Sequence, residues 1–231
     1  MPQFDLEEEP AFGREVAQEV EFLESLMGLR LSESILDVAS GAGRHALELA
    51  RRGYKNVTAL DISDQLMRIG ARTAEAADLQ VEFVKGDART VRFDGVFDAA
   101  LILGGGAFGL MEDDDENQKI LDATYEALKP GGRVVVSGMS LLWLIRTSKD
   151  LSGYDTQTGY LKTQESVNIE GSGEEKLPLN ERYFVFPGLK RQMEQAGFRS
   201  IMGFGAAPGR YSSRSISVED PEILLFGKKA K

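Results

Sequence analysis

Apolar and polar positions along the chain follow two distinct spacings. Residues 11–26 place Val16, Val20 and Leu23 on one stripe and most glutamates on the other faces, which predicts an amphipathic helix. Short apolar runs then recur, separated by segments with helical periodicity. We expect the first helix, within residues 1–30, to cover the domain that follows.

Strands and helices alternate between residues 34 and 137. Strands are predicted at 34–38, 56–60, 81–84, 97–103 and 134–137. Helices are predicted at 44–52, at 63–77 with Ser63 as N-cap, and in a segment carrying Ile120, Leu121, Thr124 and Leu128. The last helix ends at the breaker Lys129-Pro130-Gly131-Gly132. This alternation predicts right-handed βαβ units.

The alternation stops after residue 137. Strand-like runs at 160–169 and 182–186 flank Gly171-Ser172-Gly173, so we interpret 138–186 as an antiparallel insertion. A helix from Pro187 to Gly197 and strands at 200–204 and 222–227 complete the pattern. The predicted fold class is therefore α/β: a Rossmann-like, doubly wound, seven-stranded, mainly parallel sheet with helices on both faces and an antiparallel insertion after strand 5.

Composition and charge narrow the function. The 231 residues are 42% hydrophobic, enough for one domain spanning 1–231 with a buried core. Zero cysteines exclude disulfides, thiolate zinc sites and cysteine nucleophiles. The net charge is −10, and residues 1–33 hold nine acidic and two basic side chains. Nucleic acid is therefore an unexpected partner, because binding to a polyanion needs basic groups.

Several other classes lack their signals. No apolar run reaches the length of a membrane span and no secretory signal opens the chain, so we expect no membrane partner and a cytoplasmic location. With one histidine and no cysteine we expect no metal site, and neither a G-x-S-x-G elbow nor a Walker lysine motif occurs. The acidic runs at 7–9 and 113–116 are interpreted as solvated faces, the second at a helix start, where the helix dipole favours acids.

The glycine turn Gly41-Ala42-Gly43 carries the most chemical information. It joins a predicted strand to a predicted helix, where glycines allow close approach of a ligand and free N–H groups attract an anion. With Arg44, His45 and Ala46 it also matches the G-x-G-x-x-A dinucleotide fingerprint. The turn alone does not identify which cofactor binds.

Three acids end successive strands. Asp37 precedes the turn, where its carboxylate can face an ammonium group. The pyrophosphate of a dinucleotide has no use for an acid at this position. Asp61 ends the second strand, where a ribose diol would lie in either cofactor. Asp87 follows the third strand and suits an adenine amino group. Because ligands of open α/β sheets bind at the carboxyl edge, we expect these acids to converge.

Together these residues resemble the class I S-adenosylmethionine-dependent methyltransferases over nearly the whole chain. The run Ile35-Leu36-Asp37-Val38-Ala39-Ser40-Gly41-Ala42-Gly43-Arg44 is similar to the first motif of that family. Asp61 and Asp87 match its ribose-binding and adenine-binding acids. Leu128-Lys129-Pro130-Gly131-Gly132-Arg133 and Gln195-Ala196-Gly197-Phe198 are similar to its turns before the fifth and sixth strands.

The resemblance implies S-adenosylmethionine as cofactor and assigns roles by position. Backbone atoms of Ala39, Gly41 and Gly43 would line the methionine end, and Asp61 would bind the ribose. Ile62 would pack on the adenine face, Asp87 and the Ala88 N–H would read the adenine edge, and Leu103 with Gly104, Gly105 and Gly106 would border the reacting methyl. The family usually has glycine where this chain has Ala39.

The expected reaction is in-line transfer of the methyl group to a small-molecule acceptor, an amine or a hydroxyl, with release of S-adenosylhomocysteine. The insertion 138–186 is predicted to form the acceptor pocket, with Tyr154, Tyr160, Arg182 and Tyr183 as substrate candidates, although ordinary hairpin aromatics fit these positions equally. No catalytic residue is assigned, and we predict that His45 is not a catalytic base. An NAD-dependent oxidoreductase and a non-catalytic S-adenosylmethionine-binding protein stay open as alternatives.

Overall fold

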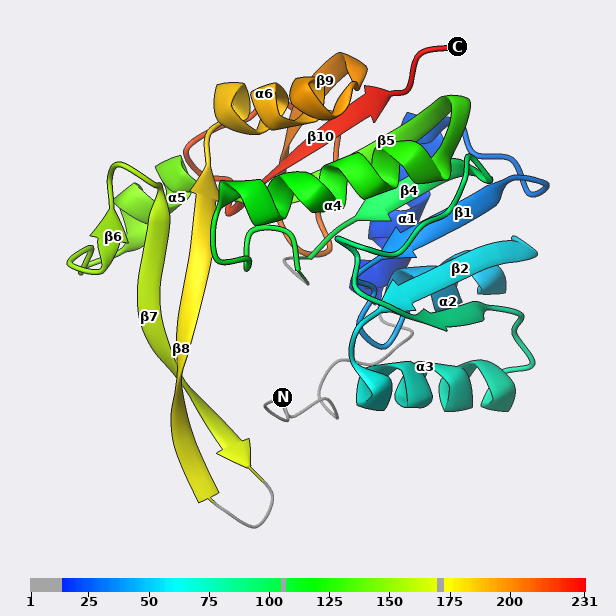
Figure 1. The fold of residues 1–231 in the computed structure, drawn as a ribbon, viewed down its shortest axis with the longest axis horizontal. Helices are drawn as coiled ribbons and strands as arrows, with labels where there is room; N and C mark the ends of the chain where they lie inside the picture. The colour runs from blue at the N-terminus through cyan, green and yellow to red at the C-terminus, as the bar shows by residue number, and fades with distance from the viewer. Residues whose placement is uncertain (1–13, 105–106, 170–172) are drawn as a thin grey trace.

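The computed structural model describes residues 14–104, 107–169 and 173–231, and its strands join into one sheet flanked by helices (Figure 1). The strands are β1 (Ser34–Val38), β2 (Asn56–Asp61), β3 (Glu82–Lys85), β4 (Phe97–Ile102), β5 (Leu128–Ser140), β6 (Tyr154–Asp155), β7 (Tyr160–Ile169), β8 (Gly173–Phe184), β9 (Arg199–Ala206) and β10 (Glu222–Lys228). The helices are α1 (Arg14–Met27), α2 (Arg44–Arg51), α3 (Asp64–Ala76), α4 (Asp114–Ala127), α5 (Leu141–Thr147) and α6 (Phe186–Ala196).

The sheet has a parallel half and an antiparallel end. Strands β3, β2, β1, β4 and β5 lie side by side in that order and pair in parallel. Strand β10 runs antiparallel between β5 and β9. These seven strands, with helices on both faces, confirm the predicted Rossmann-like fold class. The parallel strands all end at one edge, the carboxyl edge of the sheet.

Two apolar layers hold the helices to the sheet, and strand alternation divides the core between them. On one face Val20 of α1 and Leu49 of α2 pack in a buried cluster that includes Val135 of β5. On the other face Ile120 of α4 packs with Val136, the next residue of β5, in a cluster that also includes the buried side chains of α6. Side chains of successive strand residues point to opposite faces, so a continuous apolar strand fills both layers.

The end of β5 pairs with a strand of the insertion. Strand β10 occupies one edge of β5 as far as Met139, opposite Glu222. Strand β4 occupies the other edge but ends at Ile102, which pairs with Val136. Strand β8 pairs with β5 at Met139 and Ser140, and because a strand has only two edges, β8 takes the place that β4 has left. The insertion therefore joins the sheet directly beyond the end of β4.

The insertion itself is largely the predicted hairpin. Strand β7 has the predicted bounds and pairs antiparallel with β8, and in Figure 1 the two project together from the sheet. The prediction missed α5, a seven-residue helix capped by the Ser140 hydroxyl. It also gave the second hairpin strand as 182–186, whereas β8 runs from Gly173 to Phe184. It also made β5 too short, because the strand begins at Leu128, directly after α4, and reaches Ser140.

Some predicted features lie outside the described residues. These are residues 11–13 of the first helix, the acidic run 7–9, Gly105, Gly106 and the Gly171-Ser172 turn. Within the described part of the chain, no helix is both long and apolar enough to cross a membrane.

Candidate functional site

The turn between β1 and α2 reverses the chain at the carboxyl edge. Ala39, Gly41 and Gly43 all have positive φ, at 53°, 59° and 77°. Glycine adopts this left-handed region without strain, whereas a residue with a Cβ pays a steric cost there. At Gly43 a Cβ would also lie 3.1 Å from the ring of Phe83. The turn is therefore as tight as the sequence predicts, and Ala39 stands where glycine would be unstrained.

Asp61 ties this turn to the neighbouring loop. Its Oδ2 accepts a hydrogen bond from the Gly41 N–H at 2.8 Å, and its Oδ1 accepts one from the Ser63 N–H at 2.7 Å. The side chain is nearly buried, with 8% of the residue exposed. A carboxylate offers about four acceptor sites, so two stay available to hydroxyl donors such as those of a ribose.

Two polar side chains lie below the turn. The buried Asp37 carboxylate accepts a hydrogen bond from the Ala46 N–H at 3.3 Å, in the first turn of α2, and burial raises its pKa. The Ser40 hydroxyl has no solvent-accessible surface and no hydrogen-bond partner in the protein. A buried hydroxyl without a partner is costly, so its position beside the glycine turn fits a polar ligand group.

Asp87 is engaged more strongly than the sequence indicated. Arg89 grips its carboxylate through Nε and Nη2, at 3.0 and 2.6 Å, and this hydrogen bonding lowers the pKa of Asp87. The same guanidinium reaches Glu116 on α4 at 2.6 Å. An adenine amino group would share Asp87 with Arg89. Ile62, half exposed, is free to stack, and Leu103 is buried where β4 ends.

The four acceptor candidates of the insertion separate into two groups. Tyr160 and Arg182 are tied to α4, because the Tyr160 hydroxyl accepts from Asn117 at 2.8 Å and Arg182 Nε donates to Asp114 at 2.8 Å. Arg182 also lies over the Tyr160 ring. These contacts explain both residues as anchors of the hairpin.

The remaining two candidates have fewer ties. Tyr183 is buried, bonded to Glu181, and opposite Met139 in the sheet. Tyr154 is partly buried, and burial raises the pKa of its hydroxyl. The structure thus brings Tyr183 to the carboxyl edge beyond β4.

A polar cluster that the sequence analysis missed lies under α1. The buried Glu19 carboxylate contacts His45 Nε2 at 2.8 Å through Oε2 and accepts from the Gly209 N–H at 2.8 Å through Oε1. Arg44 lies 3.9 Å from the same carboxylate. Glu19 shares the stripe of Val16, Val20 and Leu23, and an acid at a stripe position was the available signal.

The cluster continues to the first residue of β10. Glu222 hydrogen-bonds with the Ser137 hydroxyl, which accepts the Gly104 N–H at 3.0 Å, directly after Leu103. The nearly buried Tyr211 also hydrogen-bonds with Ser137. Burial and the nearby Glu19 raise the pKa of Glu222. No local pattern marks Glu222, because its neighbours come from distant parts of the chain.

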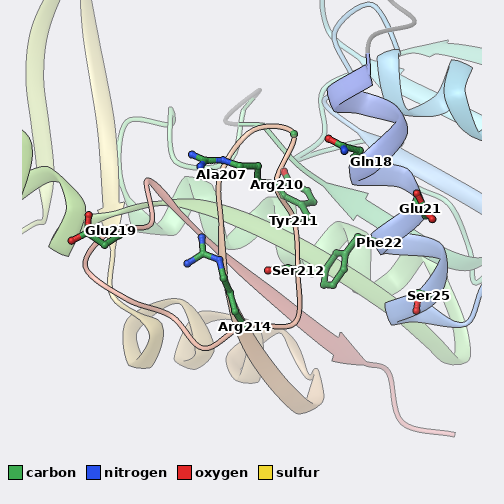
Figure 2. Close-up of a pocket in the computed structure, with 11 residues that line it drawn as sticks. Gln18, Glu21, Phe22, Ser25, Ala207, Arg210, Tyr211, Ser212, Arg214 and Glu219 are labelled. Atoms are coloured by element: carbon green, nitrogen blue, oxygen red, sulfur yellow. The ribbon is translucent and has the colours of Figure 1, made fainter.

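A groove of about 720 Å³ lies between α1 and the loop 207–219 (Figure 2). Phe22 packs edge-on against Tyr211 on one side, and Arg210, Arg214 and Glu219 contribute charges on the other. None of the residues predicted to bind cofactor or acceptor lines it. Among the described residues no group of three or more His, Asp or Glu side chains has the arrangement of a metal site.

Comparison with known proteins gives a consistent family. A family described as "Methyltransferase domain" matches residues 35–132, the segment from β1 to the start of β5. A demethylmenaquinone methyltransferase from Clavibacter sepedonicus is 35% identical over 175 residues, 73% of this chain. The match spans 66% of the length of that relative.

Solved structures agree on the fold. The CcbJ methyltransferase from Streptomyces caelestis superposes with a TM-score of 0.75 at 19% identity, over 97% of this chain and 94% of that one. The glycopeptide N-methyltransferase MtfA, in complex with S-adenosyl-L-homocysteine, superposes with a TM-score of 0.64 at 18% identity, over 92% of this chain and 89% of that one.

Proposed function

This chain belongs to the class I S-adenosylmethionine-dependent methyltransferases, and we propose that it transfers the methyl group of S-adenosylmethionine to a small-molecule acceptor by in-line substitution, releasing S-adenosylhomocysteine. The observation that carries the proposal is Asp61, which holds the Gly41 and Ser63 N–H groups while keeping acceptor sites for a ribose. The unpartnered Ser40 hydroxyl adds a polar contact at the same turn.

Different residues of the carboxyl edge bind different parts of the cofactor. Backbone atoms of Ala39, Gly41 and Gly43 line its methionine end, and Asp61 takes the ribose hydroxyls. Ile62 packs on the adenine, whose edge meets Asp87 and the Ala88 N–H. Asp37 is buried at the start of α2, where its carboxylate attracts the ammonium group of the methionine end through space.

The cofactor supplies an electrophilic methyl group on a sulfonium, and the protein supplies alignment. Leu103 and Gly104 follow the end of β4 beside the methyl position, and β8 lies directly beyond β4. An acceptor held there lies in line with the carbon–sulfur bond and away from water. Alignment of this kind accounts for a large part of the rate enhancement available to a two-substrate reaction.

The insertion 138–186 forms one wall of the acceptor pocket in this proposal, with Tyr183 and Tyr154 facing the acceptor. Tyr160 and Arg182 hold that wall to α4. The acceptor atom is an amine nitrogen or a hydroxyl oxygen, because the face of the sheet that carries Tyr183 also carries the polar side chains of Ser137 and Glu222. The acidic net charge of −10 disfavours a nucleic-acid acceptor.

The name of the Clavibacter relative provides a second candidate acceptor, a demethylated menaquinone. Such a ring is apolar, and methylation at a ring carbon would call for an apolar pocket. The buried carboxyl of Glu222 beside the expected methyl position is unfavourable for that occupant.

Two measurements test the proposal. Calorimetry with S-adenosylhomocysteine and with NAD should show binding of the first only, and binding of NAD alone would favour an oxidoreductase. Transfer of a radiolabelled methyl group should then be screened against pooled amines, pooled alcohols and demethylated quinones. Label in none of the pools, with the cofactor bound, would favour a protein that binds without catalysing transfer.

A further inference from the structure

Three side chains share one face of the sheet beyond the end of β4. Met139 lies opposite Tyr183 of β8 on one side and opposite Glu222 of β10 on the other. Residues in register across neighbouring strands point to the same face, and so do residues two apart along a strand, which adds Ser137. This is the face covered by α1 and α2, since Leu224, two residues after Glu222, belongs to their apolar cluster.

Glu222 has an oxygen without a partner on that face. Glu222 is 9% exposed, and its Oε2 is buried and has no hydrogen-bond partner in the described part of the chain. The Ser137 hydroxyl bonds the same carboxyl group and is itself held by the Gly104 N–H. An unpaired buried carboxylate oxygen costs free energy, so a hydrogen-bond donor supplied by a ligand would be favourable at this atom.

Charges around Glu222 indicate which donor fits. The groups that act on it are Glu19 of α1, Arg44 and His45 of α2, and the hydroxyls of Ser137 and Tyr211. Glu19 contacts His45 and lies 3.9 Å from Arg44, and Oε2 of Glu222 has no hydrogen-bond partner among the described residues. A carboxylate in this position is complementary to a protonated amine rather than to an anion.

Building on the methyl transfer proposed above, we propose that Glu222 is the catalytic residue that binds the acceptor, that the acceptor is a primary or secondary amine, and that Glu222 removes the proton of its ammonium form. Oε2 accepts the N–H of the incoming ammonium group, and Met139 and Tyr183 contact the carbon skeleton beside it.

The proton and electron balance of the step closes without a further reactant. The ammonium ion gives one proton to the Glu222 carboxylate and becomes a neutral amine. Its lone pair then forms the nitrogen–carbon bond, while the carbon–sulfur pair returns to sulfur and neutralises the sulfonium. The product leaves as a methylated ammonium ion, and the Glu222 carboxylic acid returns its proton to water. The raised pKa of Glu222 makes its carboxylate a better base for this transfer.

The test uses the full chain loaded with S-adenosylhomocysteine, with benzylamine as probe and benzyl alcohol as its neutral counterpart. Glu222→Gln keeps the shape of the side chain and removes its charge. We expect benzylamine binding, measured by saturation-transfer NMR and calorimetry, to weaken roughly tenfold or more, as for loss of a hydrogen bond to a charged group. Benzyl alcohol binding and S-adenosylhomocysteine affinity should change by less than about threefold.

Two controls separate a chemical role from a structural one. Glu126→Gln, on the exposed surface of α4, should leave all three affinities unchanged. In protein labelled with ¹³C-glutamate, the signal missing from Glu222→Gln should titrate at lower pH once benzylamine is added. If Glu222→Gln does not fold, that titration in the parent protein, with the signal assigned through Glu222→Asp, carries the test.

The outcomes are distinct. Failure of S-adenosylhomocysteine to bind rejects the proposed function and this inference with it. Three results overturn the amine inference alone, provided that S-adenosylhomocysteine binds. They are no binding of benzylamine, equal benzylamine affinity in Glu222→Gln and the parent, and a titration of Glu222 that benzylamine does not change.

Discussion

His45 Nε2 lies 2.8 Å from Glu19 Oε2, so the one histidine of the chain is bonded to the helix that covers it. The second oxygen of Glu19 accepts the Gly209 N–H. One carboxylate thereby joins α1, the start of α2 and the loop before β10. His45 is buried, and its Nε2 faces α1.

We predict that His45→Asn lowers kcat by less than roughly tenfold, because the His45 side chain is buried against Glu19 of α1, whereas loss of a true general base typically costs about 10² to 10⁴-fold. The melting temperature should fall, since the substitution weakens the contact with Glu19. Steady-state kinetics with an acceptor found in the screen would measure kcat. A loss of about a thousandfold, with cofactor affinity intact and the pH–rate inflection near neutrality gone, would make His45 the base.

Asp61→Ala should weaken S-adenosylhomocysteine binding by about 1.5 to 3 kcal/mol, the range for hydrogen bonds to a charged group. Calorimetry measures the effect, and circular dichroism establishes that the protein is folded. Asp64→Ala, three residues later on the exposed start of α3, is the matched control. Equal affinities of a folded Asp61→Ala protein and the parent would remove Asp61 from the cofactor site.

Ala39→Gly should stabilise the protein by up to about 1 kcal/mol. The φ of 53° strains alanine by roughly 1 to 2 kcal/mol, and glycine removes this strain. Glycine also loses more conformational entropy on folding, which offsets part of the gain. Urea unfolding measures the change. Ala71→Gly, on an exposed turn in the middle of α3, should instead lose about 1 kcal/mol. A loss of stability in Ala39→Gly equal to that of Ala71→Gly would show that no strain is stored at Ala39.

Replacing residues 153–181 by a short linker should reduce turnover much more than cofactor binding. The removed segment holds β6, β7 and most of β8, which stand beyond β4, whereas the glycine turn and Asp61 lie at β1 and β2. Calorimetry and methyl-transfer rates on the same preparation compare the two. A folded variant that turns over normally, or that no longer binds S-adenosylhomocysteine, would contradict the assignment of the insertion to the acceptor.

Glu33→Gln should lower the free energy of unfolding by about 1.5 to 3 kcal/mol at neutral pH. Burial raises the pKa of Glu33, but hydrogen bonds from Arg30 and Arg133 outweigh it and lower the pKa overall. A carboxyl group whose pKa is lowered on folding stabilises the protein above its unfolded pKa, and this stability is lost as the pH falls through the folded value.

The difference between Glu33→Gln and the parent should therefore narrow below about pH 4. Urea unfolding at several pH values measures it, with the exposed Glu75→Gln of α3 as control. A difference that stays constant down to pH 3 would mean that the charge of Glu33 contributes nothing.

Hydrophobic spacing was enough to predict most of the fold. Strand β1 and strand β7 begin and end as predicted, because their apolar or alternating runs are bounded by turns. Helix α5 was missed, because its seven residues are mostly apolar and follow a buried strand without a break, so no helical stripe is visible. Its start depends on the Ser140 cap, which any serine in a loop could equally provide.

The sequence predicts the parts of the candidate site that come from short segments at adjacent strand ends. It does not predict the parts that distant segments of the chain bring together. The glycine turn and Asp61 lie together because adjacent parallel strands end at one edge. The hydrogen bond from Arg89 to Asp87 depends on a loop conformation that the spacing of hydrophobic residues does not determine. The role proposed for Glu222 depends on its interactions with Ser137 and Glu19, which lie far from it in the sequence.

The position of β10 between β5 and β9 has a consequence for synthesis on the ribosome. Every other strand of the sheet has left the exit tunnel before β10, so the nascent chain carries an open, apolar edge along β5 until residues 222–228 arrive. The glycine turn and Asp61 need only β1 and β2 and can assemble earlier. We therefore expect a stalled chain lacking β10 to hold the proposed nucleoside-binding half of the site, to lack Glu222 and to be prone to aggregate.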